Sequence, residues 1–365
     1  MSSREARMAA LLRRARPGTM ARGGAGSPAA ILIMLAAALV FPLLEGANVA
    51  VMGIATEGLT YGLVTLALNL LMGYGGQVSI GHGGLLAVGA YTTAILATRF
   101  ALPFIVVLAL AGAVTGVAGL LLGLPAGRLR SHYLAVATLG FGVAVPQIAL
   151  NLGSLTGGFT GLIVPAEQLG SITLGNPVPL YYLALCILVA SVLAVRSILS
   201  SPTGRRFMAV RDSEDTAPAM GINVGRTKVI LFTTSAFFCG LAGYVFALNN
   251  AIVEPGSFSF SLSLFFFAAV IVGGMGSVGG SLLGAVLLVI VQHQAVSLGG
   301  YSEAILGVAV AVVLLAVPGG LAAVPRRLRG LVAGARLRHP ATAGAASLRE
   351  EPPGPPSPTG APREG

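Results

Sequence analysis

Long apolar runs constrain the fold of this chain more than any other feature of its sequence. A helix needs about 20 apolar residues to cross the hydrocarbon core of a bilayer, and about ten runs approach this length. They are Ala29–Leu44, Val49–Met72, Leu85–Thr98, Pro103–Leu124, Tyr133–Leu152, Leu180–Leu199, Val229–Leu248, Leu262–Val272, Leu282–Leu298 and Ala304–Val317. Charged residues make up only 9% of the chain, whereas soluble domains carry roughly 25%. The sequence therefore predicts an all-α polytopic membrane protein with about ten transmembrane helices.

One compact charged segment, residues 200–228, separates two of these runs, and we refer to it as the charged loop. Its eight ionised side chains are Arg205, Arg206, Arg211, Asp212, Glu214, Asp215, Arg226 and Lys228. A charge at the bilayer centre costs about 2.5–3.5 kcal/mol on insertion scales, so burying all eight would cost on the order of 20–28 kcal/mol. We therefore expect the charged loop to lie outside the membrane.

Charges between the runs indicate the direction in which the chain crosses the membrane. If the runs alternate from a cytoplasmic N-terminus, the inside segments hold the N-terminal arginines, Arg128, Arg130, the charged loop and the arginines at 326–329. The outside segments then hold one arginine, Arg99, and four glutamates at positions 45, 167, 254 and 303. This distribution obeys the positive-inside rule. Both termini are accordingly predicted to be cytoplasmic.

Three segments follow from this pattern. Residues 1–28 form a basic cytoplasmic N-terminus, and residues 29–320 form the transmembrane domain, which includes the charged loop. Residues 321–365 are rich in Pro, Gly, Ser and Ala after their arginines. This composition predicts a disordered cytoplasmic tail.

Two runs, 85–98 and 262–272, are too short to cross about 30 Å as helices. Each adjoins a glycine-rich stretch, at residues 73–84 and 273–280. Irregular backbone at membrane depth is tolerated where protein buries it or where it lines a wet cavity. We therefore expect broken or short helices there, and a substrate pathway beside them. The alternative is that the polar residues bond neighbouring helices. The candidate pathway residues are Gly75, Gln77, Ser79, His82, Gly274 and Gly276.

Patterns of catalysis and of metal binding are missing from the sequence. The four histidines share no metal-ligand spacing such as HExxH, and a P-loop requires Gly-Lys-Ser/Thr. The chain's only lysine, Lys228, is preceded by Thr227. We therefore expect no enzyme activity, no metal and no cofactor, and ATP-driven work would need a separate ATPase. The arginines cluster beside apolar runs, which argues against nucleic acid as a partner.

Four stretches of the chain resemble the permease subunits of ABC importers for branched-chain amino acids, of the LivM type. They lie within residues 68–91, 129–162, 201–223 and 272–280, in the order found in that family. The resemblance implies translocation of leucine, isoleucine or valine across a bacterial plasma (inner) membrane. It also implies a second homologous permease subunit, cytoplasmic ATP-binding subunits and an extracytoplasmic solute-binding protein as partners, besides the lipid bilayer.

Within the charged loop, the resemblance implies contact with the ATPase. The residues implied are Arg205, Arg206, Arg211, Asp212, Asp215, Ala217, Gly221 and Asn223. We expect the run Asp212-Ser-Glu-Asp to cap a short helix that Gly221 terminates. The sequence departs from the family at Pro218, where glutamate is frequent. Proline is compatible with a helix only if it occupies the first turn.

Other readings remain open on the sequence alone. The same type of importer permease could carry urea, short amides or other amino acids. From a different class, a polytopic membrane enzyme or a channel also fits the apolar runs. A docking loop for an ATPase distinguishes the importer from both, because an autonomous channel or enzyme has no need of one.

Overall fold

The computed structural model describes residues 38–43, 48–100, 102–127, 131–165, 168–169, 172–173, 175–296, 307–308 and 320–321. Every structural statement below concerns these residues. The predicted basic N-terminus lies outside them. The predicted tenth helix at 304–317 and the predicted tail at 321–365 lie almost wholly outside them as well.

Six helices in the described part of the chain are long and apolar enough to cross a membrane. They are α3 (Val49–Asn69, continued as the π-helix η1, Leu70–Tyr74), α5 (Phe104–Ala126), α6 (Ser131–Asn151), α8 (Pro177–Ser200), α10 (Val224–Asn250) and α12 (Val278–Val296). The all-α polytopic membrane fold is thus confirmed. The count of ten helices stays a prediction.

The two runs predicted to be short behave differently from each other. Helix α11 (Phe260–Gly273) has 14 residues, or about 21 Å at 1.5 Å per residue, and is short as predicted. Helix α4 (His82–Arg99) has 18 residues, or about 27 Å, close to the bilayer core. The prediction was wrong for α4 because glycines 83 and 84 were assigned to the irregular stretch, whereas the helix begins at His82.

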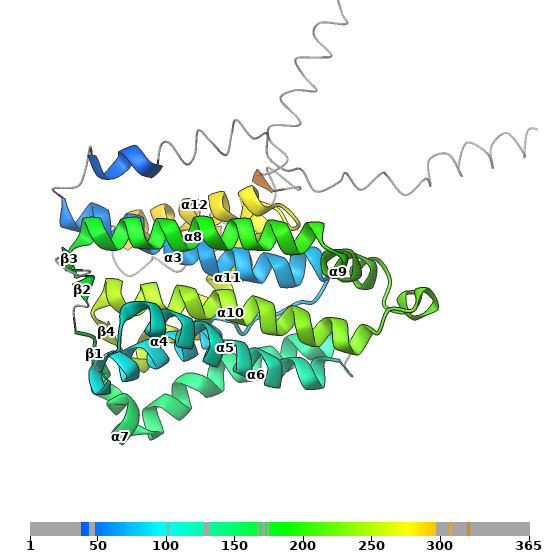
Figure 1. Ribbon diagram of the computed structural model, residues 1–365, viewed down its shortest axis with the longest axis horizontal. Coiled ribbons are helices and arrows are strands. Elements are labelled where there is room, and N and C mark those ends of the chain that lie inside the picture. The colour runs from blue at the N-terminus through cyan, green and yellow to red at the C-terminus, as the bar shows by residue number, and fades with distance from the viewer. Residues whose placement is uncertain are drawn as a thin grey trace, which may run out of the picture. The chain divides into compact units, whose positions relative to one another are not determined.

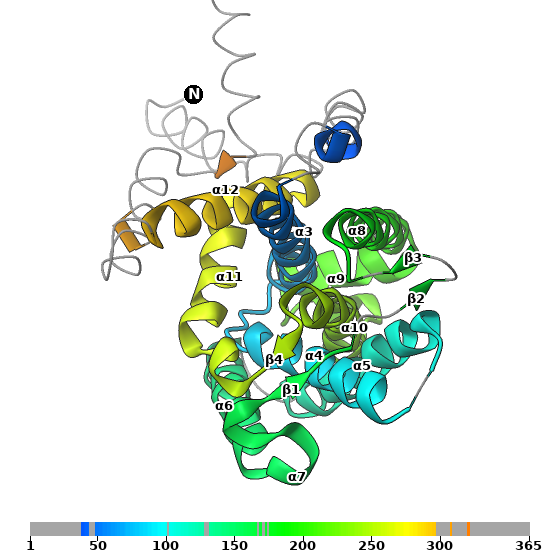
Figure 2. The ribbon, with the colours of Figure 1, turned by 90° about the vertical axis from the view of Figure 1, so that its left-hand side faces the viewer.

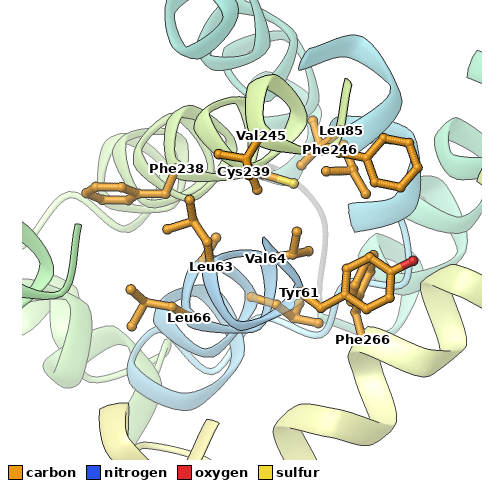
Figure 3. Packing of buried hydrophobic residues seen from close by; sticks show 14 of the residues in the cluster. Tyr61, Leu63, Val64, Leu66, Leu85, Phe238, Cys239, Val245, Phe246 and Phe266 are labelled. Carbon is orange, nitrogen blue, oxygen red and sulfur yellow. The ribbon is translucent and has the colours of Figure 1, made fainter. Parts of the chain in front are cut away.

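Helices α3 and α10 occupy the middle of the bundle, as the end-on view in Figure 2 shows. Side chains of α3, including Tyr61 and Val64, face Val245 of α10 and Phe266 of α11 in the buried core (Figure 3). Small residues permit close crossing of α4 and α10: a Cβ at Gly243 would lie 2.6 Å from the backbone nitrogen of Ala90. Such small-residue contacts replace hydrophobic driving force between helices in lipid.

The connecting segments gather at two opposite ends of the bundle (Figure 1). At one end, β1 (Leu162–Ile163) pairs antiparallel with β4 (Ile252–Val253), and β2 (Gln168–Leu169) pairs with β3 (Ile172–Thr173). Short helices α7 (Gly153–Thr156), η2 (Gly158–Thr160) and η4 (Pro255–Phe258) adjoin these segments. At the other end lie α9 (Pro202–Asp212) and η3 (Ala217–Met220). The charged loop therefore lies at the end of the bundle away from the strands.

Candidate functional site

The first glycine-rich stretch interrupts the helical path between α3 and α4. The π-helix η1 ends at Tyr74, and residues 76–81 run without helix until α4 begins at His82. Gly76 has φ +69°, a left-handed conformation that favours glycine. The predicted break is present, and we call residues 75–81 the first break.

The second break, residues 274–277 between α11 and α12, contacts the end of α3. Oδ1 of Asn69 accepts a hydrogen bond from the Gly276 backbone nitrogen at 2.8 Å, and Nδ2 of Asn69 donates to the Ser277 carbonyl at 2.9 Å. Gly73 leaves no room for a side chain, because its Cβ would collide with the Gly276 nitrogen. Asn69 therefore holds the second break against the end of α3, from which the chain leads through η1 into the first break.

The first half of the charged loop folds as helix α9. Ser201 caps it by accepting from the Thr203 nitrogen at 3.2 Å, and Pro202 stands at its start, a position where the missing N–H costs no hydrogen bond. Phe207 and Val210 are buried, while Arg205 and Arg206 on the other face are exposed. The loop is thus an amphipathic helix packed on the bundle.

The second half contains the short 3-10 helix η3. Pro218 lies in its first turn, and Gly221 ends it with φ +73°. Gly221 thus terminates the helix as predicted. Within the run predicted to cap it, Asp212 is the last residue of α9, and the hydroxyl of Ser213 accepts from the Thr216 nitrogen just before η3. Asp215 lies in the turn between the two helices.

Arg211, near the C-terminal end of α9, contacts both breaks. A Cβ at Gly76 would lie 3.1 Å from the Arg211 Cα, so glycine lets the loop backbone approach the first break. A Cβ at Gly276 would lie 3.5 Å from a guanidinium nitrogen of the same arginine. One residue of the charged loop therefore lies against both glycine-rich stretches.

Glu214 connects three segments of the chain. One carboxylate oxygen accepts from Nε2 of Gln77 at 2.8 Å, and the other accepts from Nζ of Lys228 at 2.8 Å. The Lys228 side chain is only 2% exposed. Neither Glu214 nor Lys228 was among the predicted coupling residues. The sequence does distinguish Lys228 in one respect, because it is the single lysine among 22 basic residues.

The other predicted pathway residues are packed in the interior. The His82 ring, 1% exposed, lies 3.2 Å from the Ser79 hydroxyl and 3.0 Å from the Ser235 hydroxyl of α10. Ser235 in turn donates to the Ala67 carbonyl of α3. Two cavities, of about 540 and 480 Å³, are lined by other residues. A role of Gln77, Ser79 and His82 in the pathway therefore stays a prediction.

The structure brings some predicted residues together and separates others. Gln77, Arg211 and Gly276 lie at the junction where the charged loop approaches the two breaks, and Gly75 and Gly274 lie within those breaks. Arg205, Arg206, Asp212 and Asp215 are exposed, whereas Ala217 is buried. Asn223 caps α10 by accepting from the Arg226 nitrogen at 2.9 Å.

Outside this junction, a further polar pair lies between two spans. Nε2 of His293 on α12 lies 2.8 Å from a Glu57 carboxylate oxygen on α3. The His293–Glu57 pair agrees with the interpretation that intramembrane polar residues bond neighbouring helices.

Apolar spans whose helices are separated by two glycine-rich breaks, both lying against a charged loop, are typical of helical transport permeases. The family model described as "Branched-chain amino acid transport system / permease component" matches residues 50–318. The chain therefore belongs to that permease family.

Individual relatives support the same assignment. The chain is 36% identical over 314 residues to the high-affinity branched-chain amino acid transport system permease protein LivM of Salmonella typhimurium, and 35% identical to that of Escherichia coli. Both matches cover 80% of this chain and 73% of the relative. The ribose import permease protein RbsC of Haemophilus influenzae is 26% identical over 190 residues, covering 50% of this chain and 57% of the relative. No solved structure matches the chain.

Proposed function

We propose that this chain is the membrane-spanning permease subunit of a bacterial ABC importer that moves leucine, isoleucine and valine, driven by a separate ATPase subunit. The observation that carries the proposal is the charged loop. Arg211 and Glu214 contact the helix breaks, and Arg205 and Arg206 are exposed at one end of the bundle. Such a loop suits transmission of force from a docked partner. The family match and the LivM relatives support the substrate class.

The partners follow from which end of the bundle carries each surface. We assign the end with the charged loop to the cytoplasm, where its arginines satisfy the positive-inside rule. The cytoplasmic ATP-binding subunit then meets the exposed face of α9 and η3, including Arg205, Arg206 and Met220. The extracytoplasmic solute-binding protein meets the opposite end, where the strands lie. A second homologous permease completes the pathway within the bilayer.

We place the pathway near the two breaks. Unwound backbone and helix ends at membrane depth supply groups that meet the charged ends of an amino acid, while the apolar spans suit its side chain. Alternating access would open the packed region around Gln77, Ser79 and His82 to substrate. Uptake that is unchanged after replacement of Gln77 and His82 by Ala would remove both residues from the pathway.

The overall proposal is tested by uptake in reconstituted vesicles. The chain is purified with the transporter subunits encoded beside its gene, and radiolabelled leucine uptake is measured with ATP inside the vesicles. Excess isoleucine and valine are expected to compete, while urea, acetamide and ribose are not. Leucine uptake without a co-purified ATPase would contradict the proposal and favour a channel. Competition by urea or ribose alone would overturn the substrate class.

A further inference from the structure

We infer that Glu214 is a positioning residue that couples the charged loop to the first break through Gln77 and to α10 through Lys228. The inference rests on the proposed function, because it concerns how work on the loop reaches the membrane domain. Nothing in the family resemblance singles out Glu214 or Lys228.

The Glu214 carboxylate joins three segments of the described chain through two hydrogen bonds. Its two oxygens each accept one 2.8 Å hydrogen bond, from an amide in the first break and from an ammonium on α10. The donors come from residues 137 and 14 positions away along the chain. A carboxylate suits this place, because it accepts from two donors at once, and bonds to an ionised group are the stronger ones.

Burial makes the connection costly to break. Lys228 is 2% exposed and Gln77 is 1% exposed, whereas the Glu214 side chain retains 31% exposure at the surface of the loop. Loss of one partner leaves an uncompensated charge where water is scarce. The Glu214–Lys228 pair therefore favours movements in which the charged loop, the first break and the start of α10 shift together.

Beyond Gln77, the connection continues along the backbone into the bundle. Ser79 and His82 follow in the same segment, and the His82 ring meets Ser235 of α10, which donates to the Ala67 carbonyl of α3. A shift of Glu214 thus reaches the contact between the two central helices. The backbone from Gln77 to His82, together with these hydrogen bonds, gives the loop a physical route to the region where we place the pathway.

The test separates positioning from a purely structural role. The transporter is assembled in proteoliposomes with its binding protein, and three quantities are measured: retained ATPase subunit, leucine uptake, and the ratio of leucine-stimulated to basal ATP hydrolysis. The paired variant Glu214→Leu/Lys228→Met removes both charges together, so folding and ATPase retention should persist. We expect uptake and the stimulation ratio to fall roughly 5–150-fold, the range of coupling between sites. Uptake within about twofold of wild type in this variant would overturn the inference, since two charges could then be deleted without loss of coupling.

Two further variants complete the design. Arg226→Met is the matched control, because Arg226 is exposed and lies two residues from Lys228 on the same helix; its stimulation ratio should equal that of wild type. Gln77→Glu/Glu214→Gln exchanges carboxylate and amide across one hydrogen bond, and it should recover coupling relative to either single change. Failure of this recovery would also contradict the inference. Failure of the proposed function is distinguishable, because the wild-type complex itself would then lack ATP-driven leucine uptake.

Discussion

The inner and outer faces of the charged loop differ sharply in chemistry. The inner face buries Phe207, Val210 and Ala217 and carries the Glu214–Lys228 pair. The outer face exposes Arg205, Arg206 and Met220, the last at 77%. The two faces, which lie within about twenty residues, therefore differ in role. One face fixes the loop to the breaks, and the other is available to a partner. Substitutions on the inner face should therefore lower stability, whereas those on the outer face should weaken binding of the partner.

Deletion of the largest inner side chain should have the largest effect. Phe207 is completely buried, so Phe207→Ala should lower the free energy of unfolding by about 3–5 kcal/mol through lost transfer energy and a cavity. Thermal stability in detergent, followed by size-exclusion chromatography, measures the loss. The neighbouring Met208 is exposed, and Met208→Ala should change stability by at most about 0.5 kcal/mol. Equal losses for the two variants would remove the distinction between the faces.

Gly221 tests the turn by which the chain leaves η3. Its φ of +73° is left-handed, and a Cβ there would meet nothing within 4 Å. Gly221→Ala should therefore cost about 1–2 kcal/mol from backbone conformation alone. Gly221→Asn should cost less, since asparagine tolerates this conformation better. If alanine and asparagine were equally costly in the same thermal assay, crowding rather than φ would be the cause.

The sequence predicted the spans and breaks because each depends on local composition. Apolar runs indicate helices in lipid wherever they occur, and Gly76 and Gly276 permit the positive φ angles found at the breaks. Glycine is a weaker signal for where a helix begins, since Gly83 and Gly84 follow directly on the start of α4. There the sequence placed the break too far along the chain.

The contacts that make the site were beyond sequence reasoning because they join distant segments. Asn69 meets Gly276 from 207 positions away, and Gln77 meets Glu214 from 137. A composition or a motif within either segment does not specify such a pairing. Helix α9 was also missed, although Ser201 and Pro202 form a recognisable start signal. Pro218 was understood only as compatible with a first turn, which is where it lies.

On the outer face, Met220 should affect the partner and spare the fold. Because its side chain is 77% exposed, Met220→Ala should change stability by at most about 0.5 kcal/mol. As an apolar contact in the proposed interface, its loss should weaken ATPase retention by about 1 kcal/mol, or roughly fivefold. Titration of the purified ATPase subunit onto the reconstituted permease measures this. Reduced thermal stability with full ATPase affinity would reverse the assignment of Met220 to the outer face.

Arg205 and Arg206 should give the smallest effect, and salt should reveal it. Exposed charges at the rim of an interface mainly alter the association rate and its salt dependence. Arg205→Gln/Arg206→Gln should therefore leave stability unchanged and slow ATPase association at low salt. The variant and wild type should converge near 1 M salt, where the screening length is about 3 Å. Buried pairs are screened much less, so the loss of coupling in the Glu214 and Lys228 variants should persist at the same salt concentration. A defect of the arginine variant that survived high salt would place these side chains in buried contacts, and the two faces of the loop would then no longer differ in kind.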